Sequence, residues 1–250
     1  MNARSILLGA ALLVLLVAVF VVAPKAQNQS YHLFADTEPF GSIPNSANVL
    51  SNLAFLAVGI WGLAVVLSPR KARAIAEPWE QRAYALFFAA IGVTAIGSAY
   101  YHWNPDDQTL FWDRLPMTVA FTSLAAIVIS ERIDSRTGSR LFLPLVAFGL
   151  ATVLAWRSFG DLRPYVFLQA ATLLVVLIST IFFRSRASHG IWMAGLLAGY
   201  AAALLFELLD RQVKDLLVFT GGHPLKHLAA AAGTACVVVM LLRRAAVRAD

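Results

Sequence analysis

The chain has 250 residues, of which 59% are hydrophobic and only 14% charged, and its formal net charge is +6. The charged fraction lies well below the roughly one quarter that is typical of soluble domains, and the hydrophobic content excludes intrinsic disorder. The single cysteine, Cys236, excludes an intramolecular disulfide and a zinc cluster held by cysteines. The composition therefore predicts a polytopic membrane protein, whose positive charge reflects basic loops rather than a nucleic-acid partner.

Apolar segments long enough to cross a bilayer as helices follow one another along the chain. In chain order they cover residues 5–23, 47–67, 83–101, 113–131, 141–157, 165–183, 191–209 and 222–242. No segment alternates polar and apolar residues over about ten positions, which disfavours a β-barrel. We predict an all-α polytopic membrane protein with a core of seven transmembrane helices and one extra N-terminal transmembrane helix.

The first apolar segment has two interpretations, because a signal peptide also carries a basic residue, here Arg4, before a long apolar stretch. Pro24 and Lys25 follow it in place of a small-x-small cleavage site, which favours an uncleaved anchor. We therefore expect residues 1–30 to form an N-terminal transmembrane anchor and outer loop, and residues 31–245 to form the seven-helix membrane domain.

The basic residues predict how the helices are oriented. With the N-terminus on side one, that side receives thirteen of the twenty: Arg4, Arg70, Lys71, Arg73, Arg82, Arg132, Arg136, Arg140, Arg184, Arg186, Arg243, Arg244 and Arg248. The positive-inside rule then makes both termini cytoplasmic and places loops 24–46, 102–112, 158–164 and 210–221 outside. We predict a multi-pass protein of the bacterial inner membrane, in which these arginines set topology and contact lipid headgroups. No protein partner is predicted.

Ionisable side chains inside a membrane are costly, so they indicate function. His102 ends the third segment, Asp113 opens the fourth, and His223 and His227 open the eighth, all at the outer ends of their helices. The i, i+4 spacing of His223 and His227 places their Cβ atoms about 5–6 Å apart on one helix face. A third imidazole would complete three nitrogen ligands, which is the pattern of a catalytic zinc with one open position, and Asp113 would be free to act on water there.

Each of these residues also has a plainer interpretation. Two histidines four residues apart arise by chance in helices, and histidine is favoured where a helix meets water. Ser98, which precedes His102 by four residues, could bond a backbone carbonyl. Asp113 could form a structural ion pair with Arg114. The gathering of all these residues at one end of the helices favours the metal site.

The set of Ser98, His102, Asp113, His223 and His227 resembles the signature of the alkaline ceramidases. These enzymes belong to a superfamily of seven-helix membrane hydrolases that also includes the progestin and adipoQ receptors. The stretch NVLSNLAFLAVGIWGL (Asn48–Leu63) resembles the first core helix of the ceramidases, and GSAYYHWNPDDQTLFWDRLPMT (Gly97–Thr118) resembles their bacterial branch. The resemblance runs from about Asp36 to Val239, so the first segment is an addition to the seven-helix core.

The resemblance implies a zinc-dependent amidase that hydrolyses ceramide-like lipids within the bilayer, releasing a fatty acid and a sphingoid base. It assigns His102, His223 and His227 to the zinc, Asp113 to general-base catalysis on the metal-activated water, and Ser98 to stabilising the transition state. Two alternatives stay open. One is a receptor-like membrane protein in which the zinc is structural, and the other is a hydrolase of another acyl lipid.

The sequence departs from the ceramidases in two places. Their calcium-binding segment has a glutamate where Asn45 stands here, and Asp36 and Glu38 supply only part of such a site. A second ion, Ca²⁺ held by Asp36, Glu38 and Asn45, therefore competes with a solvated acidic loop. The other departure is Lys226, between His223 and His227, which we expect to point away from the metal toward the headgroups.

Two acidic residues near the outer end of the seventh segment share one helix face. Glu207 and Asp210 are three residues apart, so either could accept a hydrogen bond from a ligand histidine and orient it. The alternative is an ion pair with Arg211 or Lys226.

Overall fold

The computed structural model describes residues 3–72 and 74–244. Apart from one isolated bridge between Phe40 and Ile43, regular structure in these residues is helical. The elements are α1 (Ala3–Phe20), η1 (Gln29–His32), α2 (Ser46–Leu50), α3 (Leu53–Leu67), α4 (Pro69–Ala72), α5 (Pro78–Trp103), α6 (Asp107–Arg132), α7 (Ser135–Phe159), α8 (Arg163–Phe182), α9 (Trp192–Leu208), α10 (Asp210–Leu217) and α11 (Gly222–Arg243).

The predicted class, an all-α polytopic membrane protein, is confirmed. Seven helical spans of the described chain are long and apolar enough to cross a membrane, and α9 with α10 adds an eighth when that bent pair counts as one span. Each apolar segment predicted from the sequence falls on one of these helices. Their polar ends extend further than predicted; α5, for example, begins at Pro78, before the apolar run itself.

The sequence suggested that residues 210–221 form a loop, but part of this segment is helical. Residues Asp210–Leu217 form α10, which is bent by 79° from α9 at Leu209. This short helix carries charged residues on one side and leucines on the other, so it lacks the long apolar run by which the other helices were recognised.

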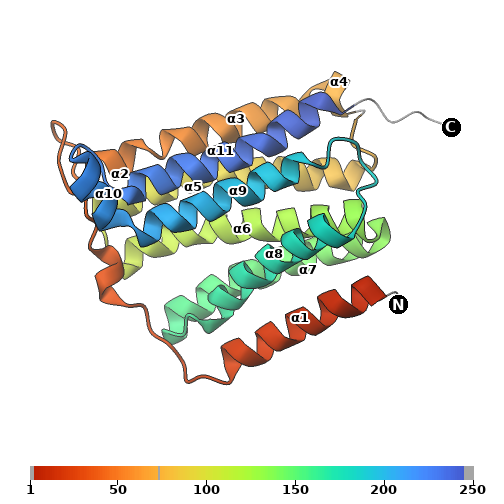
Figure 1. The fold of residues 1–250 in the computed structure, drawn as a ribbon, viewed down its shortest axis with the longest axis horizontal. Helices are drawn as coiled ribbons and strands as arrows, with labels where there is room; N and C mark the ends of the chain where they lie inside the picture. Colours follow the sequence, from red (N-terminus) through yellow and green to blue (C-terminus); the bar gives the residue numbers. More distant parts are fainter. Residues whose placement is uncertain (1–2, 73, 245–250) are drawn as a thin grey trace.

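The helices form a bundle with α1 at its edge (Figure 1). In that view α11 runs between α3 and α9, and α6 lies in the interior of the bundle. Of the most apolar 18-residue stretch of α6, 72% is buried. α1 packs against α8, and only 6% of its 18 residues are buried, as expected for an addition to the core. The chain from α1 to α2 crosses one end of the bundle, where α10 also lies, while α1 begins and α11 ends at the opposite end (Figure 1).

That opposite end holds a buried network of charged residues. Arg244 donates to both carboxylate oxygens of Glu131, at 2.6 and 2.7 Å, and the Tyr84 hydroxyl donates to Glu131 Oε1 at 2.6 Å. Arg132 donates to backbone carbonyls at the end of α8 and beyond it, including that of Phe183 at 2.9 Å. Arg244 is therefore an internal structural residue, in contrast to the headgroup contact expected from the sequence, since only 4% of it is exposed.

Candidate metal centre and active site

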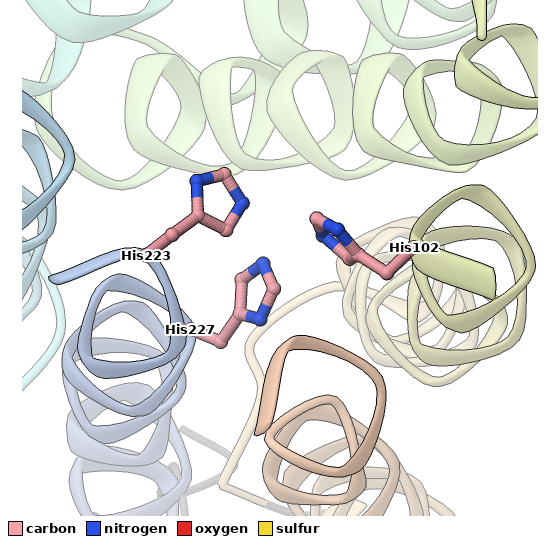
Figure 2. A group of neighbouring side chains, drawn as sticks. All are labelled: His102, His223 and His227. Carbon is pink, nitrogen blue, oxygen red and sulfur yellow. The ribbon is translucent and has the colours of Figure 1, made fainter. Parts of the chain in front are cut away.

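The three predicted metal ligands come together at the end of the bundle crossed by the α1–α2 connection. His102 lies in the last turn of α5, and His223 and His227 lie in the first turns of α11, with all three side chains turned toward one point (Figure 2). One nitrogen from each ring lies within 4.8 Å of the other two, and all three residues are buried. The ring centroids form a nearly equilateral triangle with sides of 4.9, 4.9 and 5.0 Å.

The start of α11 is fixed by Asp210. Its Oδ1 accepts the backbone N–H of His223 at 2.8 Å, and its Oδ2 accepts the N–H of Ala35 at 2.9 Å. A carboxylate at a helix N-terminus satisfies free N–H groups and the positive end of the helix dipole. Gly222 allows the close approach, because a Cβ there would lie 2.2 Å from the Phe206 carbonyl oxygen. Asp210 thus positions His223 through its backbone, whereas the sequence suggested a bond to a ligand imidazole.

His227 is oriented by Ser51, a residue the sequence analysis did not assign to the site. The Ser51 hydroxyl donates to the Asn48 carbonyl at 3.0 Å and lies 2.8 Å from His227 Nδ1. Because the hydroxyl proton is already used, Nδ1 is the donor of this second bond, which leaves the Nε2 lone pair available for a metal. Ser51 belongs to the Asn-Val-Leu-Ser-Asn motif at 48–52, so that motif was the signal that could have identified it.

His102 carries an unsatisfied nitrogen. Its Nδ1 is buried and has no hydrogen-bond partner among the described residues, while its backbone carbonyl accepts from Asn45 Nδ2 at 2.8 Å. Phe34 packs against both His102 and His223, with ring centroids 4.7 and 4.6 Å apart. Leaving a buried nitrogen unpaired costs about 1–3 kcal/mol, and a metal would satisfy it. Three convergent imidazoles without a thiolate suit zinc and other late first-row metals.

Asp113 and Ser98 meet beside this cluster because α5 and α6 approach closely. A Cβ at Gly97 would lie 2.2 Å from the Trp112 carbonyl oxygen, so only glycine permits the contact. This contact brings Ser98 of α5 and Asp113 of α6 to the same cavity wall. Ser98, Asp113 and His227 line one cavity of about 300 Å³. The alternative ion pair of Asp113 with Arg114 is absent from the described structure, since Arg114 hydrogen-bonds Gln27 instead.

A comparison with protein families gives an independent result. The family model described as Ceramidase matches residues 41–246. The chain belongs to the ceramidase family. The match covers α2 to α11, including His102, His223, His227 and Asp113, and it begins after α1 and η1. A search of curated proteins finds no match for this chain. Membership of the ceramidase family supports a ceramide-hydrolysing, membrane-embedded enzyme that acts on amide bonds.

Two of the three residues considered for calcium have partners within the protein. Asp36 is buried, accepts the N–H of Gly221 at 3.2 Å and pairs with Lys214 at 3.2 Å. Asn45 binds the His102 carbonyl, and Glu38 is exposed. Asp36 and Asn45 thus connect the α1–α2 segment to the ends of α11 and α5. Calcium binding by this segment stays a prediction.

Glu207 and Lys226 form the ion pair that the sequence left as one alternative. Lys226 Nζ lies 2.9 Å from Glu207 Oε1 and 3.4 Å from His223 Nε2, and both residues line the cavity. The prediction that Lys226 points away from the metal is therefore wrong. Its physical reason is helical geometry, because residues three apart, such as His223 and Lys226, are neighbours on one helix face.

Proposed function

We propose that this ceramidase-family protein is a zinc-dependent hydrolase that cleaves the amide bond of ceramide-like lipids to a fatty acid and a sphingoid base. The observation that carries the proposal is the convergence of His102, His223 and His227, the last of which lines one cavity with Asp113. Three neutral nitrogen ligands leave a fourth position open on a tetrahedral ion, which a structural zinc would fill with protein.

His102, His223 and His227 would hold the ion. Zinc bound there would supply Lewis-acid chemistry, polarising the amide carbonyl and bringing the pKa of water toward neutrality. The Ser51 hydroxyl contributes by holding the His227 ring in the tautomer that can bind a metal.

Asp113 is the general base in this proposal. Its carboxylate accepts a proton from the attacking water and later delivers it to the leaving amine, so that the carbon–nitrogen bond breaks without releasing an unstable amide anion. The Ser98 hydroxyl, which lines the cavity with Asp113, would donate to the negative oxygen that develops on the carbonyl. Both groups line the same cavity as His227.

An apolar cavity of about 130 Å³ extends from this site into the bundle, and the acyl chain of the substrate would lie there. It shares Phe55, Met117, Phe121 and Tyr200 with the cavity beside the histidines. Further along, it is lined by leucine and valine side chains of α6, α8 and α9. An acyl chain in this space would place its carbonyl at the polar end, beside Asp113.

The membrane arrangement follows from charge. We place the protein in a bacterial inner membrane with both termini in the cytoplasm and the histidine cluster on the outer side, because most basic residues fall on the opposite side. α1 with the following loop, residues 1–30, would then be an anchor attached to the catalytic domain of residues 31–245.

The experiment that tests the proposal is metal removal and restoration. Protein purified in detergent is treated with a chelator and assayed for fatty-acid release from N-acyl-sphingosine, before and after zinc is added back. We expect the chelated protein to be inactive and zinc to restore hydrolysis. Hydrolysis that survives complete metal removal would contradict the proposed mechanism.

A further inference from the structure

Arg114 is a buried cation that has no anionic partner among the described residues. Only 6% of the residue is exposed, and no carboxylate of the described chain lies within ion-pairing distance of its guanidinium. Nη2 donates to Gln27 Oε1 at 2.7 Å, but Nη1 has no hydrogen-bond partner among the described residues. A buried charge that lacks a partner is costly, so a cation kept in this state points to a ligand that supplies the anion.

Aromatic rings hold the guanidinium in place. Its central carbon lies 4.5 Å from the ring centroid of Trp156, 4.8 Å from that of Tyr165 and 5.6 Å from that of Tyr31. Stacking of this kind suits arginine better than lysine and fixes the plane of the donor groups. Arg114, Tyr31 and Tyr165 also line the cavity that contains Asp113 and His227, so a bound molecule there can reach them.

The order of residues along α6 shows which part of a substrate Arg114 would meet. Met117, Phe121 and Leu124 line the apolar cavity, and each lies progressively further along α6 from Asp113. With 1.5 Å of rise per residue, the acyl chain runs away from Asp113 in that direction. The amide carbonyl then sits beside Asp113, and the amine portion of the lipid lies at the cavity wall formed by Arg114 and Tyr31.

We infer that the substrates are N-acyl lipids whose amine portion carries an oxyanion, a carboxylate or a phosphate, which Arg114 binds. This inference rests on the proposed function and narrows its substrate class. The reaction is R–CO–NH–R′ + H₂O giving R–COOH + H₂N–R′, in which R′ carries the anion. Guanidinium groups bind both kinds of oxyanion through paired N–H donors, and the free Nη1 supplies a donor that is not engaged by protein.

The test compares three substrates with the same acyl chain and a two-carbon amine: N-palmitoylglycine, N-palmitoylethanolamine and the phosphate ester of the latter. We expect kcat/KM of the wild-type protein for at least one anionic substrate to exceed that for the neutral one. Arg114→Gln should lower the ratio of kcat/KM for the anionic substrate to kcat/KM for the neutral one by at least about tenfold, as expected for a lost charged hydrogen bond. The anion with the larger ratio identifies the headgroup chemistry.

Two further variants control for packing effects. Arg114→Lys keeps the charge and should retain part of the preference. Arg157→Gln removes an exposed arginine of α7 that stacks on Phe111 and does not line the cavity, so it should leave both ratio and activity unchanged. An equal ratio in wild type and Arg114→Gln, with hydrolysis intact, would overturn the inference and leave the proposed function standing.

A binding measurement tests the inference independently of hydrolysis. Equilibrium binding of N-palmitoylglycine and N-palmitoylethanolamine is measured with Asp113→Asn, which retains the cavity but should not turn over substrate. Tighter binding of the glycine lipid that is lost on adding Arg114→Gln supports the inference even if no amide is hydrolysed. Equal affinity for the two lipids overturns it.

Discussion

The two ends of the helix bundle both bury charged side chains, but they satisfy them differently. At the end where α1 begins, Glu131 accepts from Arg244 and Tyr84 at 2.6–2.7 Å, and Ser130 hydrogen-bonds both Glu80 and Arg186. The carboxylates there have donors within the protein. A network of this kind is closed, and its function is to hold α5, α6 and the end of α11 together.

At the other end some charged groups are paired, such as Asp36 with Lys214 and Glu207 with Lys226, but the groups beside the cavity are not. Asp113 has no cationic partner within 4.0 Å among the described residues, Arg114 has no carboxylate, and His102 Nδ1 is unpaired. These groups lie in or beside a cavity rather than against one another. The comparison teaches that the pairing of buried charge, more than its presence, separates a structural cluster from a binding site in this bundle.

The largest effect is expected at Asp113. Asp113→Asn keeps the shape of the site but removes the base, so turnover should fall by about 10²- to 10⁴-fold while the metal content is unchanged. Steady-state hydrolysis and elemental analysis of the same preparation measure both quantities. Asp215→Asn, which alters an exposed carboxylate of α10, is the matched control. Full activity in Asp113→Asn would show that another group is the base.

Mutations in the closed network around Glu131 should lower the stability of the fold. Glu131→Ala leaves Arg244 buried without its partner, and we expect a loss of about 3–5 kcal/mol in the free energy of unfolding. Thermal unfolding in detergent measures the loss, and metal content per folded chain should not change. Glu77→Ala, which removes an exposed carboxylate at the same end, should be nearly silent. A loss of metal in Glu131→Ala would mean that the two ends are not independent.

Ser51 tests whether ligand orientation matters at the open end. Ser51→Ala removes the hydroxyl that fixes the His227 ring, so metal affinity should fall by about 10- to 100-fold. Competition with a chelator of known affinity gives the value. Ser46→Ala removes a hydroxyl that bonds the Glu38 carbonyl and touches no histidine, and it should retain the wild-type affinity. Equal affinities in the two variants would remove Ser51 from the site.

The smallest effect is expected from an ion pair at the surface. Hydrogen bonds from the Arg163 guanidinium, at 2.9–3.0 Å, hold the pKa of the Asp161 carboxyl below its ordinary value. A lowered pKa contributes stability above the unfolded-state pKa, and this contribution is lost as pH falls through the folded-state pKa. Asp161→Asn should therefore cost no more than about 1 kcal/mol at pH 7 and nothing at pH values below both pKa values. A larger difference in melting temperature at low pH than at pH 7 would contradict this account.

Much of the fold and the grouping of the three histidines could be predicted because the signals are local. Apolar runs determine where helices cross the membrane, and the i, i+4 spacing puts His223 and His227 on one face whatever surrounds them. Helix ends at a common side of the membrane also bring His102 near them. α10 was missed for the same reason, since a helix of eight residues with half its positions charged leaves no apolar run.

The remaining features depend on contacts between distant parts of the chain. Ser51 reaches His227 across 176 positions, and Arg114 reaches Gln27 across 87, which no local pattern encodes. Helix geometry could have predicted that Lys226 lies on the cavity side of α11, but its partner Glu207 lies on another helix. Sequence patterns therefore identified the histidine cluster better than the residues that orient it.

The central claim, that the histidine cluster is a catalytic zinc site, is tested most directly by metal analysis of detergent-purified wild type and His102→Ala. Fatty-acid release from N-acyl-sphingosine is followed in the same samples, and size-exclusion chromatography confirms that both are folded. We predict one zinc ion per wild-type chain, and loss of both zinc and hydrolysis in His102→Ala. Absence of metal from the wild type, or zinc retained in an inactive His102→Ala, would contradict the account.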